Sequence, residues 1–122
     1  MSNVVKRIDT VFLQVSNLER AVQWYKEVFD LDTVFESDGS NDRYTVLQVG
    51  ETPITLMENK TVNNESLTHP ILYFFSDDID SAHDKVKSHS KDCSDVTLED
   101  GVNFFEFKDL DGNPLGICNF SE

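Results

Sequence analysis

The sequence lacks the features that mark membrane-spanning and secreted proteins. Within its 122 residues, no apolar run approaches the roughly 20 residues that a membrane span needs. The N-terminal stretch 1–7 has no apolar core behind its basic pair, so it does not resemble a signal peptide. These absences predict a cytoplasmic protein with no membrane partner.

Cysteine and basic residues are also scarce. Cys93 and Cys118 lie far apart in the sequence, and without a secretion signal we expect both to be reduced thiols. Lys and Arg number 10 against 23 Asp and Glu, which gives a formal net charge of −13 at pH 7. Clustered cations are what nucleic acids and anionic membranes bind, so neither is an expected partner. The acidic surface favours solubility, or else the attraction of a cationic ligand.

The common catalytic motifs are missing as well. The sequence has no glycine-rich phosphate loop, no serine nucleophile elbow and no context that would activate a cysteine. Asp109, Asp111 and Asn113 resemble the start of a calcium loop, but the later glycine and the terminal glutamate are absent. We therefore interpret this stretch as a turn.

What the sequence does contain is an internal repeat. An apolar strand predicted at 11–15 runs into Ser16-Asn17-Leu18-Glu19-Arg20-Ala21, and another at 71–75 runs into Ser76-Asp77-Asp78-Ile79-Asp80-Ser81-Ala82. Each junction has Ser and an Asn or Asp, which cap helices, followed by Leu or Ile, an acid and Ala. The repeat predicts two copies of one strand–helix unit.

The expected helix ends and the later strands complete each unit. Ser16 and Glu19 predict a capping box for the first helix, and Asp30 stands where a helix often ends in a left-handed glycine. Asp77 or Asp78 is expected to cap the second helix. Strand-like segments follow at about 32–37, 43–49, 53–58, 95–99, 102–108 and 114–120, with a turn at 38–41.

These elements predict an α+β protein made of two βαβββ modules. Module one covers about 7–59, a polar linker about 60–69, and module two about 70–120, all within a single domain of residues 1–122. Side chains alternate along a strand, so each sheet has two faces. One face is uniformly apolar and should pack beneath a helix. The other mixes aromatic, small and polar side chains, which suggests a lined concavity or an interface.

The candidate ligand-binding residues belong to this mixed face. They are expected to stack on a planar group or to contact a small molecule: Phe12, Gln14, Tyr44, Met57, Tyr73, Phe75, Phe104 and Cys118.

The order and spacing of the motifs resemble the vicinal oxygen chelate superfamily, which includes glyoxalase I, extradiol dioxygenases and bleomycin-resistance proteins. The resemblance covers about residues 7–120. It rests on Val15 to Ala21, on Trp24-Tyr25-Lys26 with Val28-Phe29-Asp30-Leu31, and on the final hairpin Phe107 to Ile117. Leu110 stands in place of the hairpin's usual proline, and Asp30 in place of a glycine. The resemblance implies that both modules contribute to a curled mixed sheet around a central cup.

The same resemblance implies where a metal ion would lie. Metal-using members place one ligand on each of four strands, and the matching positions here are Thr10, Thr55, Ile71 and Gly116. None is a credible ligand for zinc, nickel, iron or manganese, so we expect no metal and no cofactor. The histidines are interpreted as linker or surface residues: His69, His83 and His89.

Three functions remain open. The resemblance favours a metal-free homodimer of the bleomycin-resistance kind, which binds a small, cationic or aromatic molecule in the cup. The alternative is a glyoxalase-type lyase, isomerase or dioxygenase with atypical ligands or metal-free acid–base chemistry. Glu106 is its candidate catalytic residue, Glu58 is the other acid near the cup, and Tyr44 or Tyr73 is the partner. A third reading is a structural or regulatory dimer whose mixed face is only an interface.

Overall fold

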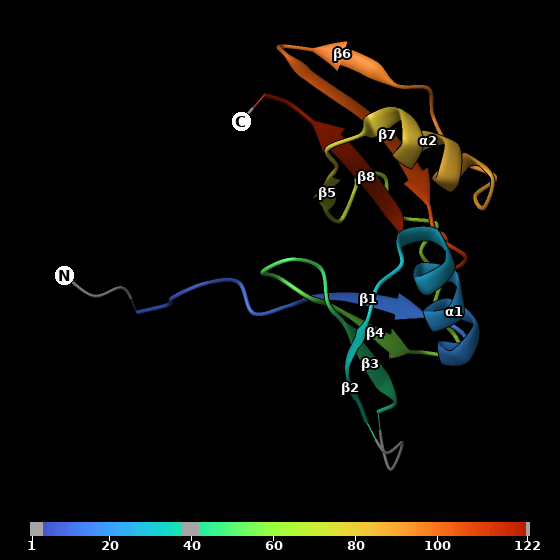
Figure 1. The fold of residues 1–122 in the computed structure, drawn as a ribbon. Coiled ribbons are helices and arrows are strands. Elements are labelled where there is room, and N and C mark those ends of the chain that lie inside the picture. Colours follow the sequence, from blue (N-terminus) through green and yellow to red (C-terminus); the bar gives the residue numbers. More distant parts are fainter. Residues whose placement is uncertain (1–3, 38–41, 122) are drawn as a thin grey trace. The chain divides into compact units, whose positions relative to one another are not determined.

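The structure is a computed structural model that describes residues 4–37 and 42–121. The chain forms two compact units, Met1–Lys60 and Thr61–Glu122, which divide at the start of the predicted linker. In the described residues, each unit has one helix and one four-stranded mixed sheet (Figure 1). The α+β class and the two βαβββ modules are therefore confirmed, while a single domain stays a prediction. No helix of the described residues is long and apolar enough to cross a membrane.

The first module follows the predicted order closely. Strand β1 (Val11–Val15) leads into helix α1 (Leu18–Phe29), and strands β2 (Thr33–Glu36), β3 (Tyr44–Leu47) and β4 (Ile54–Glu58) follow. In space the strands are ordered β1-β4-β3-β2, with β1 parallel to β4 and the other pairs antiparallel. The predicted turn at 38–41 lies outside the described residues.

The second module repeats this arrangement. It consists of β5 (Tyr73–Phe75), α2 (Ile79–Lys87), β6 (Thr97–Glu99), β7 (Val102–Lys108) and β8 (Pro114–Asn119). The strands are ordered β5-β8-β7-β6, and β5 is parallel to β8 as β1 is to β4. The register also repeats: Phe12 pairs with Thr55 in the first module as Tyr73 pairs with Gly116 in the second.

The beginning of α1 differs from the predicted capping box. Asn17 rather than Ser16 is the cap, because its side-chain oxygen accepts a hydrogen bond from the Arg20 amide at 3.0 Å. Glu19 forms an ion pair with Arg43. The predicted capping box was therefore wrong.

The other predicted caps are confirmed. Asp30 ends α1 in the left-handed conformation, with φ 55°, although a residue with a Cβ is disfavoured there. Asp78 caps α2 by accepting from the Ser81 amide at 3.1 Å. In the final hairpin, one carboxylate oxygen of Asp109 accepts from the Asp111 and Asn113 amides, each at 2.9 Å. This stretch is a turn, as expected.

Each helix covers one face of its own sheet, and the uniformly apolar rows lie beneath it (Figure 1). In the first module the buried residues include Leu13, Val15, Tyr25, Ile54 and Leu56. In the second module they include Val86, Phe105, Phe107, Leu115 and Ile117. The face of each sheet away from the helix is left to the mixed rows, and these contain the candidate ligand-binding residues.

Candidate functional site

The mixed face of the first module consists of two rows that run across its strands. Phe12, Thr55, Val46 and Phe35 form one row, because β1 pairs with β4, β4 with β3 and β3 with β2 at these positions. Gln14, Met57 and Tyr44 form the next row. The Phe35 and Tyr44 rings lie with their centroids 5.9 Å apart.

This face is hollowed. A cavity of about 540 Å³ is lined by three of the predicted residues, Phe12, Tyr44 and Met57, and also by Val34 and Phe35. Phe12 is 57% exposed although it is large and apolar. Gln14 does not line the cavity; its side chain accepts a hydrogen bond from the Asn59 amide group at 2.9 Å.

Val34 and Phe35 are lining residues that the sequence reasoning missed. The alternation along β2 places Phe35 opposite Val46 in the first row. The pattern Thr33-Val-Phe-Glu therefore contained the signal, but a register shift between Thr33 and Phe35 breaks the simple alternation. The sequence alone does not reveal that irregularity.

Thr10 and Thr55 are the two positions of the first module at which the resemblance places metal ligands. Their side chains are hydrogen-bonded to each other. Their hydroxyl oxygens lie 2.8 Å apart, and the Thr10 hydroxyl donates to the Pro53 carbonyl at 3.0 Å. A hydroxyl has one proton, so Thr55 is the donor between the two threonines. Thr55 is only 3% exposed, and this pairing satisfies it inside the sheet.

The mixed face of the second module is organised around Tyr73. Tyr73, Gly116 and Glu106 form a row across β5, β8 and β7. The Tyr73 ring lies over Gly116: a Cβ at that position would be 2.6 Å from Cδ2 and 2.7 Å from Cζ of the ring. The Tyr73 hydroxyl donates a hydrogen bond to the Glu106 carboxylate. Residue 116 must therefore lack a side chain for the ring to take this place.

The next row in this module contains Phe75, Cys118 and Phe104. The Tyr73 and Phe104 rings meet edge to face, with centroids 6.4 Å apart and planes at 72°. Phe75 packs in the same manner against Phe120. The structure thus brings Tyr73, Phe104 and Glu106 together, with Phe75 and Cys118 beside them.

The local environment raises the pKa values of two groups on this face, Tyr73 and Cys118. Burial, followed by the hydrogen bond to Glu106, raises the pKa of Tyr73 to about 12. Burial also raises the pKa of the Cys118 thiol. Both groups therefore stay protonated at neutral pH, so Tyr73 acts as a hydrogen-bond donor and Cys118 as a small apolar side chain.

Glu58 is not near the mixed face, contrary to expectation. On β4 it shares the helix-facing side with Ile54 and Leu56, and its carboxylate accepts from the Leu18 amide at 3.0 Å and from Arg43 at 3.2 Å. The Leu18 amide, and after it the charge of Arg43, lower the pKa of Glu58. Its side chain is 7% exposed. Glu58 therefore supports the beginning of α1.

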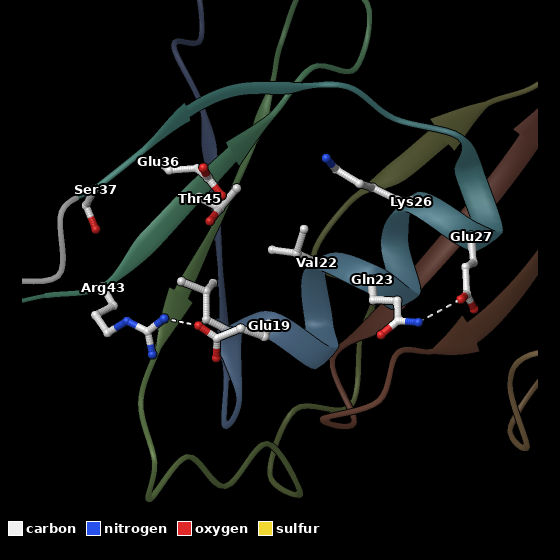
Figure 2. Close-up of a pocket in the computed structure, with 10 residues that line it drawn as sticks. Glu19, Val22, Gln23, Lys26, Glu27, Glu36, Ser37, Arg43 and Thr45 are labelled. Atoms are coloured by element: carbon white, nitrogen blue, oxygen red, sulfur yellow. Dashed lines mark hydrogen bonds and ion pairs between the residues drawn. The ribbon is translucent and has the colours of Figure 1, made fainter.

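A second hollow of the first module lies between α1 and strands β2 and β3, with a volume of about 620 Å³. Figure 2 shows Glu19 of the helix reaching Arg43 across this hollow, and Gln23 bonded to Glu27 along the helix. Arg43 is paired with Glu19, and the walls of the hollow have no aromatic side chain. The aromatic cavity is therefore the better candidate for a ligand.

A comparison with models of known protein families identifies the family. Residues 7–117 match the profile of the Glyoxalase/Bleomycin resistance protein/Dioxygenase superfamily. The chain belongs to this superfamily. A search of curated protein sequences found no match to this chain.

Solved structures with the same superfamily fold include proteins of different function. TnmS3, an antibiotic binding protein from Streptomyces sp. CB03234, is 20% identical with a TM-score of 0.81, covering 98% of this chain and 100% of that one. The fosfomycin resistance protein FosX from Listeria monocytogenes is 13% identical with a TM-score of 0.78, covering 97% and 96%. A glyoxalase family protein from Enterococcus faecalis is 20% identical with a TM-score of 0.75, covering 93% and 97%. At these identities the likeness establishes the fold.

A further solved structure with this fold, a variant of FosX, contains Mn(II). The four motif-matched positions of this chain do not fit such an ion. Ile71 and Gly116 have no donor side chain, and the Thr10 and Thr55 hydroxyls bond to each other. Among residues 4–37 and 42–121, no group of three or more His, Cys, Asp or Glu is placed to hold a metal. His69 is exposed, and the His83 ring contacts Phe105 edge to face.

Proposed function

We propose that this protein binds a small planar molecule without a metal ion, on the mixed face of the first module. The observation that carries the proposal is the cavity of about 540 Å³ whose walls include Phe12, Phe35, Tyr44 and Met57. Its volume lies within the range of small-molecule sites. Aromatic and thioether side chains offer flat, polarisable contacts to a planar ring.

The same proposal includes the charge of the ligand and the state of the protein. A net charge of −13 favours a cationic ligand over an anionic one. Exposed aromatic side chains such as Phe12 and Tyr73 suit a surface that a ligand or a second copy covers, and we propose a homodimer. The free thiols of Cys93 and Cys118 suit a reducing, cytoplasmic location.

Titration with two dyes of similar shape tests the binding function. Proflavine is a planar cation and phenazine is a neutral planar ring. Both should bind the wild-type protein, and proflavine more tightly. Tyr44→Ala should weaken both by about fivefold, the effect of losing one aromatic contact of about 1 kcal/mol. Leu98→Ala is the control. Leu98 is exposed, but it belongs to the second module and lies on the helix-facing side of that sheet.

Three results would count against the proposal. Stoichiometric metal in the purified protein would contradict metal-independent binding. Equal affinity of wild type and Tyr44→Ala would place the dye elsewhere. A dimer that binds neither dye would favour the structural or regulatory alternative.

The enzymatic alternative has one observation in its favour, the hydrogen bond from Tyr73 to Glu106. A proton-transfer pair works best when the pKa of its acid lies near the working pH. The pKa of Tyr73 is about 12, so Tyr73 is a poor proton donor to a substrate at neutral pH. This pair is better suited to holding a charge in place than to moving a proton.

A further inference from the structure

We infer that the second module carries a subsite for an organic cation, an amine or a quaternary ammonium group, formed by the Glu106 carboxylate and the Tyr73 and Phe104 rings. The subsite goes beyond the proposed function, because it is a second binding site that is complete within the second module. Its residues lie on β5 and β7 of that module.

The Glu106 carboxylate is anchored by Tyr73, and the backbone of this residue is anchored by Ser94. The Tyr73 hydroxyl donates to the carboxylate, and the Glu106 backbone is fixed to Ser94 on both sides. The Glu106 amide donates to the Ser94 hydroxyl at 2.9 Å, and the Ser94 amide donates to the Glu106 carbonyl at 2.8 Å. A carboxylate fixed in this way loses little freedom when it binds a cation.

The Tyr73 and Phe104 rings are nearly perpendicular, with centroids 6.4 Å apart. The two rings contact each other edge to face beside the carboxylate, so a cation on an outward ring face meets negative ring density next to a full negative charge. Tyr73 is 43% exposed and Glu106 is exposed as well, so a ligand has access to both.

The corresponding row of the first module has different side chains. In the first module the row that corresponds to Tyr73, Gly116 and Glu106 is Phe12, Thr55 and Val46. The second module therefore has a hydroxyl on the first ring and a carboxylate in place of an aliphatic side chain, at the positions where the two groups meet. The glycine between them allows the ring to lie across the strand. A plain packing role would not require a charge at this point of the row.

The pKa of Tyr73 is consistent with this role. Because burial and Glu106 raise it to about 12, the phenol stays neutral and keeps donating to the carboxylate throughout the physiological pH range. No ion pair joins Glu106 to a lysine or arginine of the described part of the chain. An external cation therefore does not have to displace an internal one.

The probe for this subsite is tetramethylammonium, with neopentyl alcohol as its neutral counterpart of similar shape. The aromatic NMR signals of Tyr73 and Phe104, assigned from the spectra of Tyr73→Phe and Phe104→Leu, should shift with tetramethylammonium chloride. They should not shift with sodium chloride at equal ionic strength, and they should shift less with the alcohol. Higher salt should weaken the effect, because an exposed charge pair is screened.

Two substitutions with the same change in net charge separate a site from a general field. Glu106→Gln keeps an oxygen for the Tyr73 hydroxyl but removes the charge, and it should weaken tetramethylammonium binding about fivefold, the effect of one exposed ion pair. Glu99→Gln removes an acid from neighbouring β6 and should leave the affinity unchanged. Tyr73→Phe keeps the ring and the charge but frees the carboxylate, so it should weaken binding by a smaller factor. It also provides a test if Glu106→Gln does not fold.

The inference is overturned if Glu99→Gln weakens binding as much as Glu106→Gln, because the charge would then act only at a distance. It is also overturned if the alcohol and the cation shift the rings equally, or if neither shifts them. Failure of the planar-ligand proposal has a different signature, since phenazine would then leave the signals of Phe12 and Tyr44 in the first module unmoved.

Discussion

Replacing Gly116 by alanine tests the placement of the Tyr73 ring. The added Cβ would lie 2.6 Å from Cδ2 and 2.7 Å from Cζ of that ring, and real Cβ atoms essentially never come within 3.0 Å of another heavy atom. The φ of Gly116 is not positive, so alanine meets no backbone strain at this position. Any strain that Gly116→Ala causes in the folded protein therefore comes from the ring.

The magnitude follows from two opposing contributions. Overpacking a filled position costs about 1–3 kcal/mol, and we expect the lower part of this range because Tyr73 is 43% exposed and can turn toward solvent. Alanine in place of glycine also restricts the unfolded chain, which stabilises the folded state by about 0.4–1 kcal/mol. Gly116→Ala should thus destabilise the protein by about 1 kcal/mol.

In a Tyr73→Ala background the ring is gone and only the second contribution remains. The same substitution at residue 116 should then stabilise the protein by about 0.5 kcal/mol, so its sign reverses. Urea unfolding followed by far-ultraviolet circular dichroism on wild type, both single variants and the double variant measures this coupling. If Gly116→Ala has the same sign and size in both backgrounds, the ring does not lie over Gly116 and the reasoning fails.

Three further predictions concern the cap of α1 and the pKa values of Glu58 and Tyr73. Asn17→Ala should destabilise the protein by about 1 kcal/mol in urea and Ser16→Ala should have little effect; a larger effect of Ser16→Ala would restore the capping box. The Leu18 amide and Arg43 lower the folded-state pKa of Glu58 below its ordinary 4.5, so the stability it supplies is present above pH 4.5 and is lost as the pH falls through the folded-state value. The stability gap between wild type and Glu58→Gln should therefore narrow in acid, and a constant gap would contradict this. In an ultraviolet titration Tyr73 should ionise at about pH 12 rather than 10.0, and this step should be missing from Tyr73→Phe. Its contribution to stability is present below pH 10.0 and is lost as the pH rises to about 12.

The fold could be predicted from the sequence because its signals are local. Alternation along 102–108 and the turns beside it predicted a strand with the bounds that β7 has. The helical stripe of α1 was equally readable, because its apolar residues recur at the helical period. These signals need only neighbours in the chain, so they survive without knowledge of the tertiary structure.

The candidate site was harder to predict, because it depends on neighbours far apart in the sequence. Both Ser16 and Asn17 can cap a helix. In the structure the Arg20 amide donates to Asn17, and Glu19, which a capping box needs, pairs with the distant Arg43 instead. The parity of β4 already placed Glu58 with Ile54 on the helix side, so that error was avoidable. By contrast, the contact between Tyr73 and Gly116 requires the register of β5 on β8, which one sequence does not specify.

The two modules differ in how they fill the positions at which the resemblance places metal ligands. In the first module Thr10 and Thr55 bond to each other, so exchanging both for ligands would remove that bond and the bond from Thr10 to the Pro53 carbonyl. In the second module a ligand at residue 116 would need a Cβ where the Tyr73 ring already lies. Gly116→Glu would therefore displace the ring and release Glu106 before it could contact any ion. The absence of a side chain at residue 116 thus permits the Tyr73–Glu106 pair, and a donor side chain placed there would disrupt it.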